Sequence, residues 1–166
     1  MKTYVIIVSR YFPATHKRRG EETFFREKIL SGQGDRYKHK LVQECFQKPP
    51  EKIHTIRANF ELWANRIKEV QEGKAVLSLR YWSGKPYRSK QVEICRLAKD
   101  DGVGVQLLSF SGGFFSSQLV DGEIKYWNLE ILAKNDGLSF DDFREWFRSY
   151  DLTKPMAIIH FTKFRY

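Results

Sequence analysis

The stretch from residue 75 to residue 120 constrains the fold most, because it consists of strand-like runs joined by turns. Residues 75–82, "AVLSLRYW", place apolar side chains on one face, as a half-buried strand does. Similar runs follow at residues 91–98, 103–110 and 115–120, and Asp121-Gly122 is a strong hairpin signal. No helical pattern separates these runs, so the order lacks the βαβ alternation of a doubly wound sheet.

Three other segments have helical spacing of apolar residues. They are residues 21–31, which are followed by Gly32; residues 60–73, which end at Gly73; and residues 140–147, with Ser139 as N-cap and Asp142 in the capping-box position. Apolar runs at residues 4–8 and 156–164 add two strands. We therefore expect an α+β fold, a small mixed β-barrel flanked by about three helices. It would form a single domain over residues 1–166, with a long basic loop at about residues 33–51 and an exposed basic loop at residues 16–20.

The chain is strongly basic, with 29 lysine and arginine residues against 20 acids and a net charge of +9. A charge of this size favours a polyanionic partner such as nucleic acid, although it also fits a basic domain that needs only solubility. Cys45 and Cys95 form no CxxC pair, which favours a reducing cytoplasm and a protein without structural disulfides. No run approaches the length of a membrane span, so we expect no membrane partner. A monomer is the default oligomeric state.

The sequence contains none of the common enzyme signatures: no P-loop, GxGxxG, GxSxG or HExxH motif. Its four histidines are scattered, and an isolated histidine is more often a surface or packed residue than a ligand. We therefore expect no cofactor and no metal.

Hydrogen-bonding side chains gather at residues 52–57 of "EKIHTIRANFELW" (residues 51–63), just before the second helix begins near Phe60. Lys52, Thr55 and Arg57 in "KIHTIR", together with the later "LAKNDGLSFDDFREWF", resemble two motifs of the ASCH family in the PUA-like superfamily: G-x-K-x-x-T-x-R and a D-G-[FL] turn followed by a helix. Two departures stand out. Gly32 is separated from Lys52 by the basic loop, and Asp136 stands where the family has glutamate.

The resemblance implies a compact β-barrel with a cleft for a nucleobase, a nucleoside or RNA. Some members are amidohydrolases that act on N4-acetylcytidine, and carried over to this chain the catalytic groups would be Lys52, Thr55 and Asp136. Independently of the family, a threonine hydroxyl needs a base, and a lysine can serve if burial or a cation such as Arg57 lowers its pKa. Residues three apart in a strand point to opposite faces, so the lysine and the threonine converge only if the chain turns between them. Alternatively, these charges are solvated and the threonine pairs locally.

A second cluster, "RYWSGKPYRSKQ" at residues 80–91, alternates cations with aromatic rings around a turn. Bases stack on aromatic faces and phosphates pair with cations, although an ordinary hairpin has the same composition. The sequence thus leaves two functions open. One is a module that binds RNA or a modified nucleobase, and the other is an amidohydrolase with Thr55 as nucleophile, Lys52 as base and Asp136 as proton donor. The candidate binding residues are Lys52, His54, Arg57, Trp82, Tyr87, Arg88 and Lys90.

Overall fold

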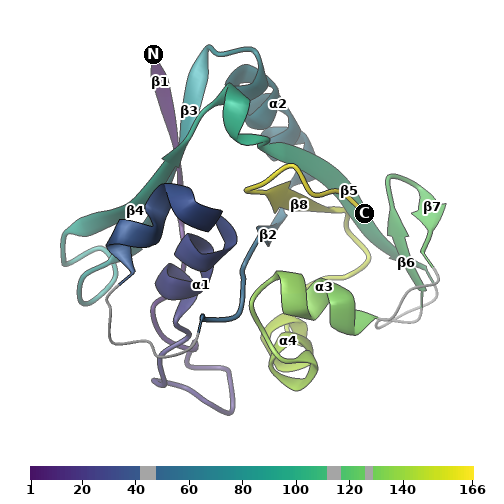
Figure 1. Ribbon diagram of the computed structural model, residues 1–166. Helices are drawn as coiled ribbons and strands as arrows, with labels where there is room; N and C mark the ends of the chain where they lie inside the picture. The colour runs from purple at the N-terminus through teal and green to yellow at the C-terminus, as the bar shows by residue number, and fades with distance from the viewer. Residues whose placement is uncertain (42–47, 112–116, 126–128) are drawn as a thin grey trace.

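The protein is built from two β-sheets and four α-helices in the part of the chain that the computed structural model describes, residues 1–41, 48–111, 117–125 and 129–166 (Figure 1). The strands are β1 (Lys2–Ile7), β2 (His54–Ala58), β3 (Ala75–Trp82), β4 (Gln91–Leu97), β5 (Gly104–Ser111), β6 (Ser117–Val120), β7 (Glu123–Ile124) and β8 (Met156–His160). The helices are α1 (Phe25–Gly32), α2 (Phe60–Gln71), α3 (Leu129–Asn135) and α4 (Phe140–Phe147), with short 3-10 helices η1 (Gly34–Lys40) and η2 (Lys99–Asp101).

The first sheet has the order β1-β3-β4, and the second has the order β2-β8-β5-β6-β7. Strand β1 is parallel to β3, whereas all the other pairs are antiparallel. The α+β class is therefore confirmed. Over the described residues no strand pairing joins the two sheets into a closed barrel.

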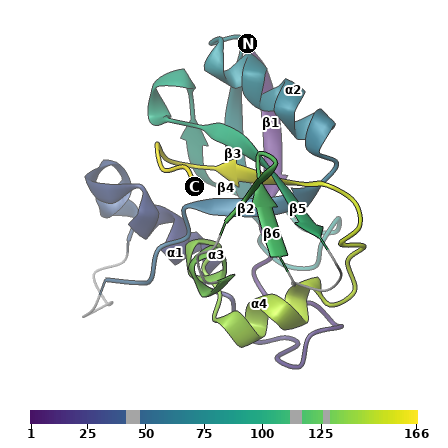
Figure 2. The same cartoon turned by 90° about the vertical axis from the view of Figure 1, so that its right-hand side faces the viewer.

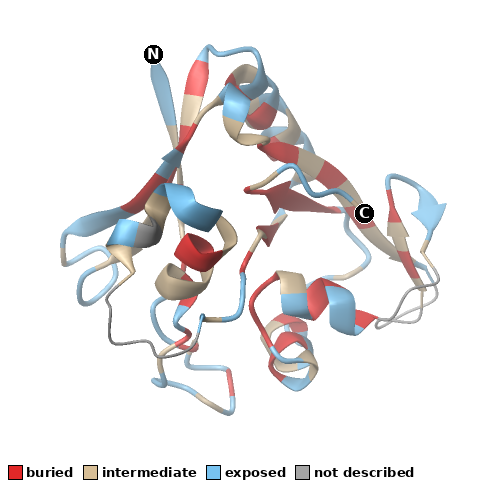
Figure 3. Ribbon diagram, viewed as in Figure 1, coloured by how far each residue is buried: buried red, intermediate tan, exposed pale blue. Residues whose placement is uncertain are grey.

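Helix α2 connects the sheets, because it packs on β3 of the first sheet and on β5 and β8 of the second. It lies at one end of the molecule, and α3 and α4 lie at the other (Figure 2). Strand β8 is buried along its whole length, as expected for a strand between two neighbours in a sheet covered by helices (Figure 3). The buried apolar side chains of both sheets and all four helices form one core cluster.

The structure corrects several predicted boundaries. The first helix begins at Phe25 rather than at residue 21, because Phe24 has a left-handed backbone (φ 56°) that a helix cannot include. The last strand ends at His160 rather than at residue 164. Strand β2 and helix α3 were not predicted at all. Both are short, and β2 carries polar side chains on its buried positions, which hides the strand pattern.

The two predicted basic loops are also more ordered than expected. Residues 34–40 of the long loop form η1, while residues 42–47 lie outside the described part of the chain. In the loop at residues 16–20, His16 is buried, and Arg18 Nη1 donates to Asp142 Oδ2 of α4 at 2.6 Å. Asp142 therefore ties this loop to α4 rather than completing a capping box, although Ser139 does cap the helix.

No helix within the described ranges is long and apolar enough to cross a membrane.

Candidate functional site

The segment that leads into β2 passes between helices α1 and α3 (Figure 1), and Lys52, which it carries, is buried. The backbone N–H of Lys52 donates to the carbonyl of Lys28 in α1 at 2.9 Å, and the next N–H, of Ile53, donates to the carbonyl of Asn135 in α3 at 2.9 Å. Gly32 lies against this segment, so close that a Cβ there would be 3.1 Å from the Lys52 carbonyl oxygen. The glycine that is distant from the lysine in the sequence is therefore its neighbour in space.

The Lys52 ammonium group forms a buried ion pair with Asp136. Its Nζ lies 2.6 Å from Oδ1 and 2.5 Å from the backbone oxygen of Asp136, and the Phe25 ring lies beneath it with its centroid 4.3 Å away. The two residues are only 1% and 4% exposed. Removing one partner would leave an uncompensated buried charge, which is strongly destabilising.

The surroundings of the pair change the pKa of both groups. Burial lowers the pKa of Lys52, the charge of Asp136 opposes this effect, and the positive charge of Arg57 adds to it. Burial alone would raise the pKa of Asp136, but the charge of Lys52 and the nearby His54 bring it below its ordinary value. The pair therefore contains an ionised carboxylate and an ammonium group that loses its proton more easily than an exposed lysine.

Thr55 and Arg57 reach the same small cavity as the ion pair, from strand β2. The cavity measures about 90 Å³ and is lined by Val8, Ser9, Phe25, Lys52, Thr55, Ile56, Arg57, Asp136, Trp146, Phe147 and Tyr150. Lys52 and Thr55 would point to opposite faces if both lay in one strand. Lys52 lies before β2, which begins at His54, so this restriction does not apply to it. All three residues carried over as catalytic groups thus line one cavity.

Arg57 has a spare hydrogen-bond donor at this cavity. Its Nη2 donates to the Ile7 carbonyl at 2.6 Å, while its buried Nε has no partner in the described structure. Burial lowers the pKa of this guanidinium group. A buried N–H without a partner costs free energy, and an oxygen atom of a ligand would relieve that cost.

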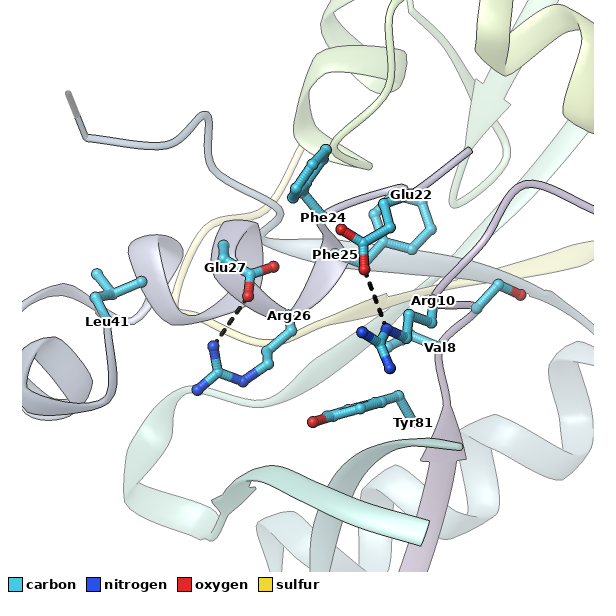
Figure 4. A pocket seen from close by; sticks show the side chains of 10 residues that line it. Val8, Arg10, Glu22, Phe24, Phe25, Arg26, Glu27, Leu41 and Tyr81 are labelled. Carbon is cyan, nitrogen blue, oxygen red and sulfur yellow. Dashed lines mark hydrogen bonds and ion pairs between the residues drawn. The ribbon is translucent and has the colours of Figure 1, made fainter. Parts of the chain in front are cut away.

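A larger pocket of about 480 Å³ adjoins the small cavity and shares Val8, Ser9 and Phe25 with it. Figure 4 shows two ion pairs in this pocket, Arg10 with Glu22 at 3.1 Å and Arg26 with Glu27 at 2.9 Å, together with the ring of Tyr81. Its remaining lining residues are Phe24 and Leu41. The pocket combines aromatic surface with paired charges of both signs.

His54 does not line either cavity, in contrast to its predicted role in binding. Neighbouring residues in a strand point to opposite faces, so Thr55 faces the small cavity and His54 faces away from it. The His54 ring is fully buried, with Nδ1 3.6 Å from Asp136 Oδ1 and Nε2 2.7 Å from the hydroxyl oxygen of Tyr166. His54 therefore lies next to Asp136 of the ion pair without lining the small cavity.

The second predicted cluster lies on the hairpin between β3 and β4, and neither cavity includes it. The rings of Trp82 and Tyr87 pack on each other with centroids 5.4 Å apart, and Tyr87 is 89% exposed. Arg88 and Lys90 are exposed as well. The hairpin is thus a separate basic and aromatic surface.

Sequence reasoning missed several residues around the ion pair. Lys28 donates to the Gly137 carbonyl at 2.8 Å, and Trp146 and Tyr150 line the cavity from α4 and the turn after it. Tyr166 accepts a hydrogen bond from Asn135 Nδ2 at 2.9 Å. Asn135 directly precedes Asp136 in the quoted motif, whereas nothing in the sequence pattern marked Tyr166.

The described residues contain no group of three or more histidine, cysteine or acidic side chains placed to hold a metal ion. In comparisons with protein-family models, curated proteins and solved structures, nothing matched this chain.

Proposed function

We propose that the protein binds a nucleobase, either in a nucleoside or in RNA, with the polar edge of the base in the small cavity. The observation that carries this proposal is that Lys52, Thr55, Arg57 and Asp136 line one cavity although they come from distant parts of the chain. The edge of a base presents carbonyl acceptors and amino donors, which suit a buried ammonium, guanidinium and carboxylate group. The motif resemblance to the ASCH family, and the PUA-like barrel that it implies, point to the same ligand class.

The sizes of the two cavities support a ligand that occupies both. Pockets for small molecules usually enclose about 300–1,000 Å³, so the small cavity alone accommodates only the edge of a ring. The larger pocket adjoins the small cavity, and three residues line both. In this proposal the sugar, or the neighbouring nucleotide of RNA, lies in the larger pocket beside Tyr81.

Calorimetric titration with cytidine, N4-acetylcytidine and a short single-stranded RNA tests this function. We expect at least one of them to bind, and Arg57→Gln to weaken binding by tenfold or more, because one lost charge-assisted hydrogen bond is worth about 1.5–3 kcal/mol. Arg88→Gln, on the exposed hairpin, is the matched control and should bind as the wild type does. RNA binding should also weaken as salt is added. The absence of any binding at low salt would contradict the proposal.

A second function, amide hydrolysis on an acylated base, is favoured because Thr55 lies in the same cavity as Lys52. In this scheme Lys52 first gives up its proton to solvent, which its lowered pKa favours. Thr55 Oγ then attacks the acyl carbonyl carbon, and its proton passes to the neutral amine of Lys52. The C–N bond then breaks, and the amine leaves with a proton. Water hydrolyses the threonine ester, which releases the free acid and restores the hydroxyl group.

The electrostatics favour Lys52 rather than Asp136 as the donor of that proton. The lysine charge lowers the pKa of Asp136 and keeps it ionised, so the carboxylate suits the role of orienting Lys52. The spare Nε–H of Arg57 can stabilise the negative charge on the acyl oxygen. This assignment replaces Asp136 as proton donor in the scheme derived from the sequence.

Incubation with N4-acetylcytidine tests the second function by release of cytidine and acetate. We expect Thr55→Val, which keeps the shape of the side chain, to abolish release while binding persists. If the wild-type protein binds N4-acetylcytidine but never releases cytidine, hydrolysis is refuted and binding remains as the proposed function.

A further inference from the structure

Arg57 brings a positive charge to the small cavity without a carboxylate to balance it. Its guanidinium group donates to the Ile7 carbonyl at 2.6 Å, its buried Nε has no partner in the described structure, and no ion pair between described residues includes it. The acid whose charge acts on Arg57 is Asp136, and that carboxylate is already held by Lys52 Nζ at 2.6 Å. Arginine is rarely buried unless it is paired.

The charges around the cavity therefore leave an excess of one. Lys52 and Asp136 form an ion pair that is neutral as a whole, and Arg57 is the remaining charged residue that lines the cavity. A buried charge costs free energy unless it is paired and hydrogen-bonded. A ligand group with a single negative charge would remove this cost, whereas a dianion would replace one uncompensated charge with another.

The cavity also supplies hydrogen-bond donors for such a group. Thr55 and Arg57 are two positions apart in β2, so their side chains point to the same face of the strand. Ser9, Thr55 and Tyr150, which line the cavity, each carry a hydroxyl group. Its volume of about 90 Å³ corresponds to about three water molecules, which suits an anion with a few heavy atoms.

We propose that the small cavity binds a small monovalent carboxylate, whose oxygen atoms are held by the guanidinium group of Arg57. A planar carboxylate accepts two parallel hydrogen bonds from a guanidinium group, which makes this pairing stronger than one with a neutral carbonyl. In the hydrolysis scheme this anion is the acid that water releases from the threonine ester, with its proton given to solvent. That reading rests on the proposed function, and in it the product occupies the place of the next acyl group.

The first test compares acetate with acetamide, which has nearly the same shape and no charge. The indole N–H signal of Trp146, which lines the cavity, is followed in the full 15N-labelled chain at pH 7.5 while sodium acetate replaces sodium chloride at constant ionic strength. We expect a saturating shift with acetate and none with acetamide. Arg57→Gln should weaken acetate binding by tenfold or more, whereas Arg88→Gln, on the exposed hairpin, should bind as the wild type does.

Three results of this test would overturn the proposal. They are equal shifts with acetate and acetamide, undiminished acetate binding in Arg57→Gln, and tighter binding of phosphate, which is mainly a dianion at this pH. The comparison of acetate with acetamide uses the wild type alone, so it decides the proposal even if a variant fails to fold.

The second test links the carboxylate to the proposed function by competition. Acetate at its own dissociation constant should double the apparent dissociation constant of N4-acetylcytidine, because the two ligands share one cavity. A wild-type protein that binds acetate but not N4-acetylcytidine would refute the proposed function and leave the carboxylate site standing. Binding of N4-acetylcytidine without any binding of acetate would overturn the carboxylate site alone. If both bind without competing, the acid does not occupy the place of the acyl group.

Discussion

Protonation of His160 should destabilise the protein in mild acid. The side chain is fully buried in β8, opposite His54 of β2 in the sheet register, and neither ring nitrogen has a hydrogen-bond partner in the described structure. Burial lowers the pKa of His160 from 6.5 to about 2, and the electrostatic effects of His54 and Arg165 act in the same direction. The neutral ring is therefore strongly preferred in the folded state.

The size of the effect follows from the difference between the folded and unfolded pKa of this group. Above pH 6.5 neither state binds the proton, and the full stability is present. As the pH falls below 6.5, only the unfolded state takes up the proton, so stability is lost at about 1.4 kcal/mol per pH unit down toward pH 2. At pH 4.5 the loss due to His160 alone amounts to about 3 kcal/mol, a large part of the usual stability of a small domain.

Denaturant unfolding of the wild type and of His160→Phe, at pH 7.5 and at pH 4.5, measures this loss. Phenylalanine keeps the ring and removes both unpartnered nitrogens, so we expect the variant to lose about 3 kcal/mol less than the wild type between the two pH values. His39→Asn, at an exposed histidine, is the control and should follow the wild type. Equal losses in the wild type and His160→Phe would refute the argument.

Three further predictions concern single positions. Gly137→Ala and Gly122→Ala both place a side chain at positive φ (77° and 80°). Only at Gly137 would the new Cβ lie 3.0 Å from Cβ of Lys52, so only Gly137→Ala should impair ligand binding in titrations. Ser139→Ala should lower the free energy of unfolding by about 1 kcal/mol in urea titrations, because the N-cap hydrogen bond of α4 is lost. Burial raises the pKa of the Cys95 thiol to about 12. In the Cys45→Ser variant, Cys95 should therefore react with a thiol reagent at pH 8 only after the protein unfolds. Rapid reaction of the native protein would contradict this prediction.

The sequence predicted best those elements whose pattern is local. Helix α2 was expected over residues 60–73 and runs from Phe60 to Gln71, and α4 occupies the predicted residues 140–147 behind its serine cap. In both helices the spacing of the apolar residues and the residues at the helix ends indicate the same boundaries. The local sequence was therefore sufficient to predict them without knowledge of tertiary contacts. Strand β2 lacked such a pattern, because its buried positions hold the polar residues His54 and Thr55 and the strand it pairs with, β8, lies near the other end of the described chain.

The composition of the cavity could be anticipated only in part. Spacing alone could not bring Asp136 to Lys52, since the ion pair joins residues 84 positions apart, and only the resemblance between motifs suggested it. The same limit applied to Tyr166, because a buried hydrogen bond leaves no periodic signal in a sequence. His54 was expected at the binding surface, yet strand alternation next to Thr55 turns it to the opposite side. Charge and aromatic content likewise could not separate the exposed hairpin of Trp82 from the cavity.

The location of the ligand tests the central claim most directly. In a 15N-labelled sample, the indole N–H signal of Trp146, which lines the small cavity, and that of Trp82, on the hairpin, can be followed together during titration with N4-acetylcytidine. If the base enters the cavity formed by Lys52, Thr55, Arg57 and Asp136, the Trp146 signal should shift progressively to saturation while the Trp82 signal stays in place. A saturating shift of Trp82 with no change at Trp146 would show that the hairpin, and not the cavity, binds the ligand.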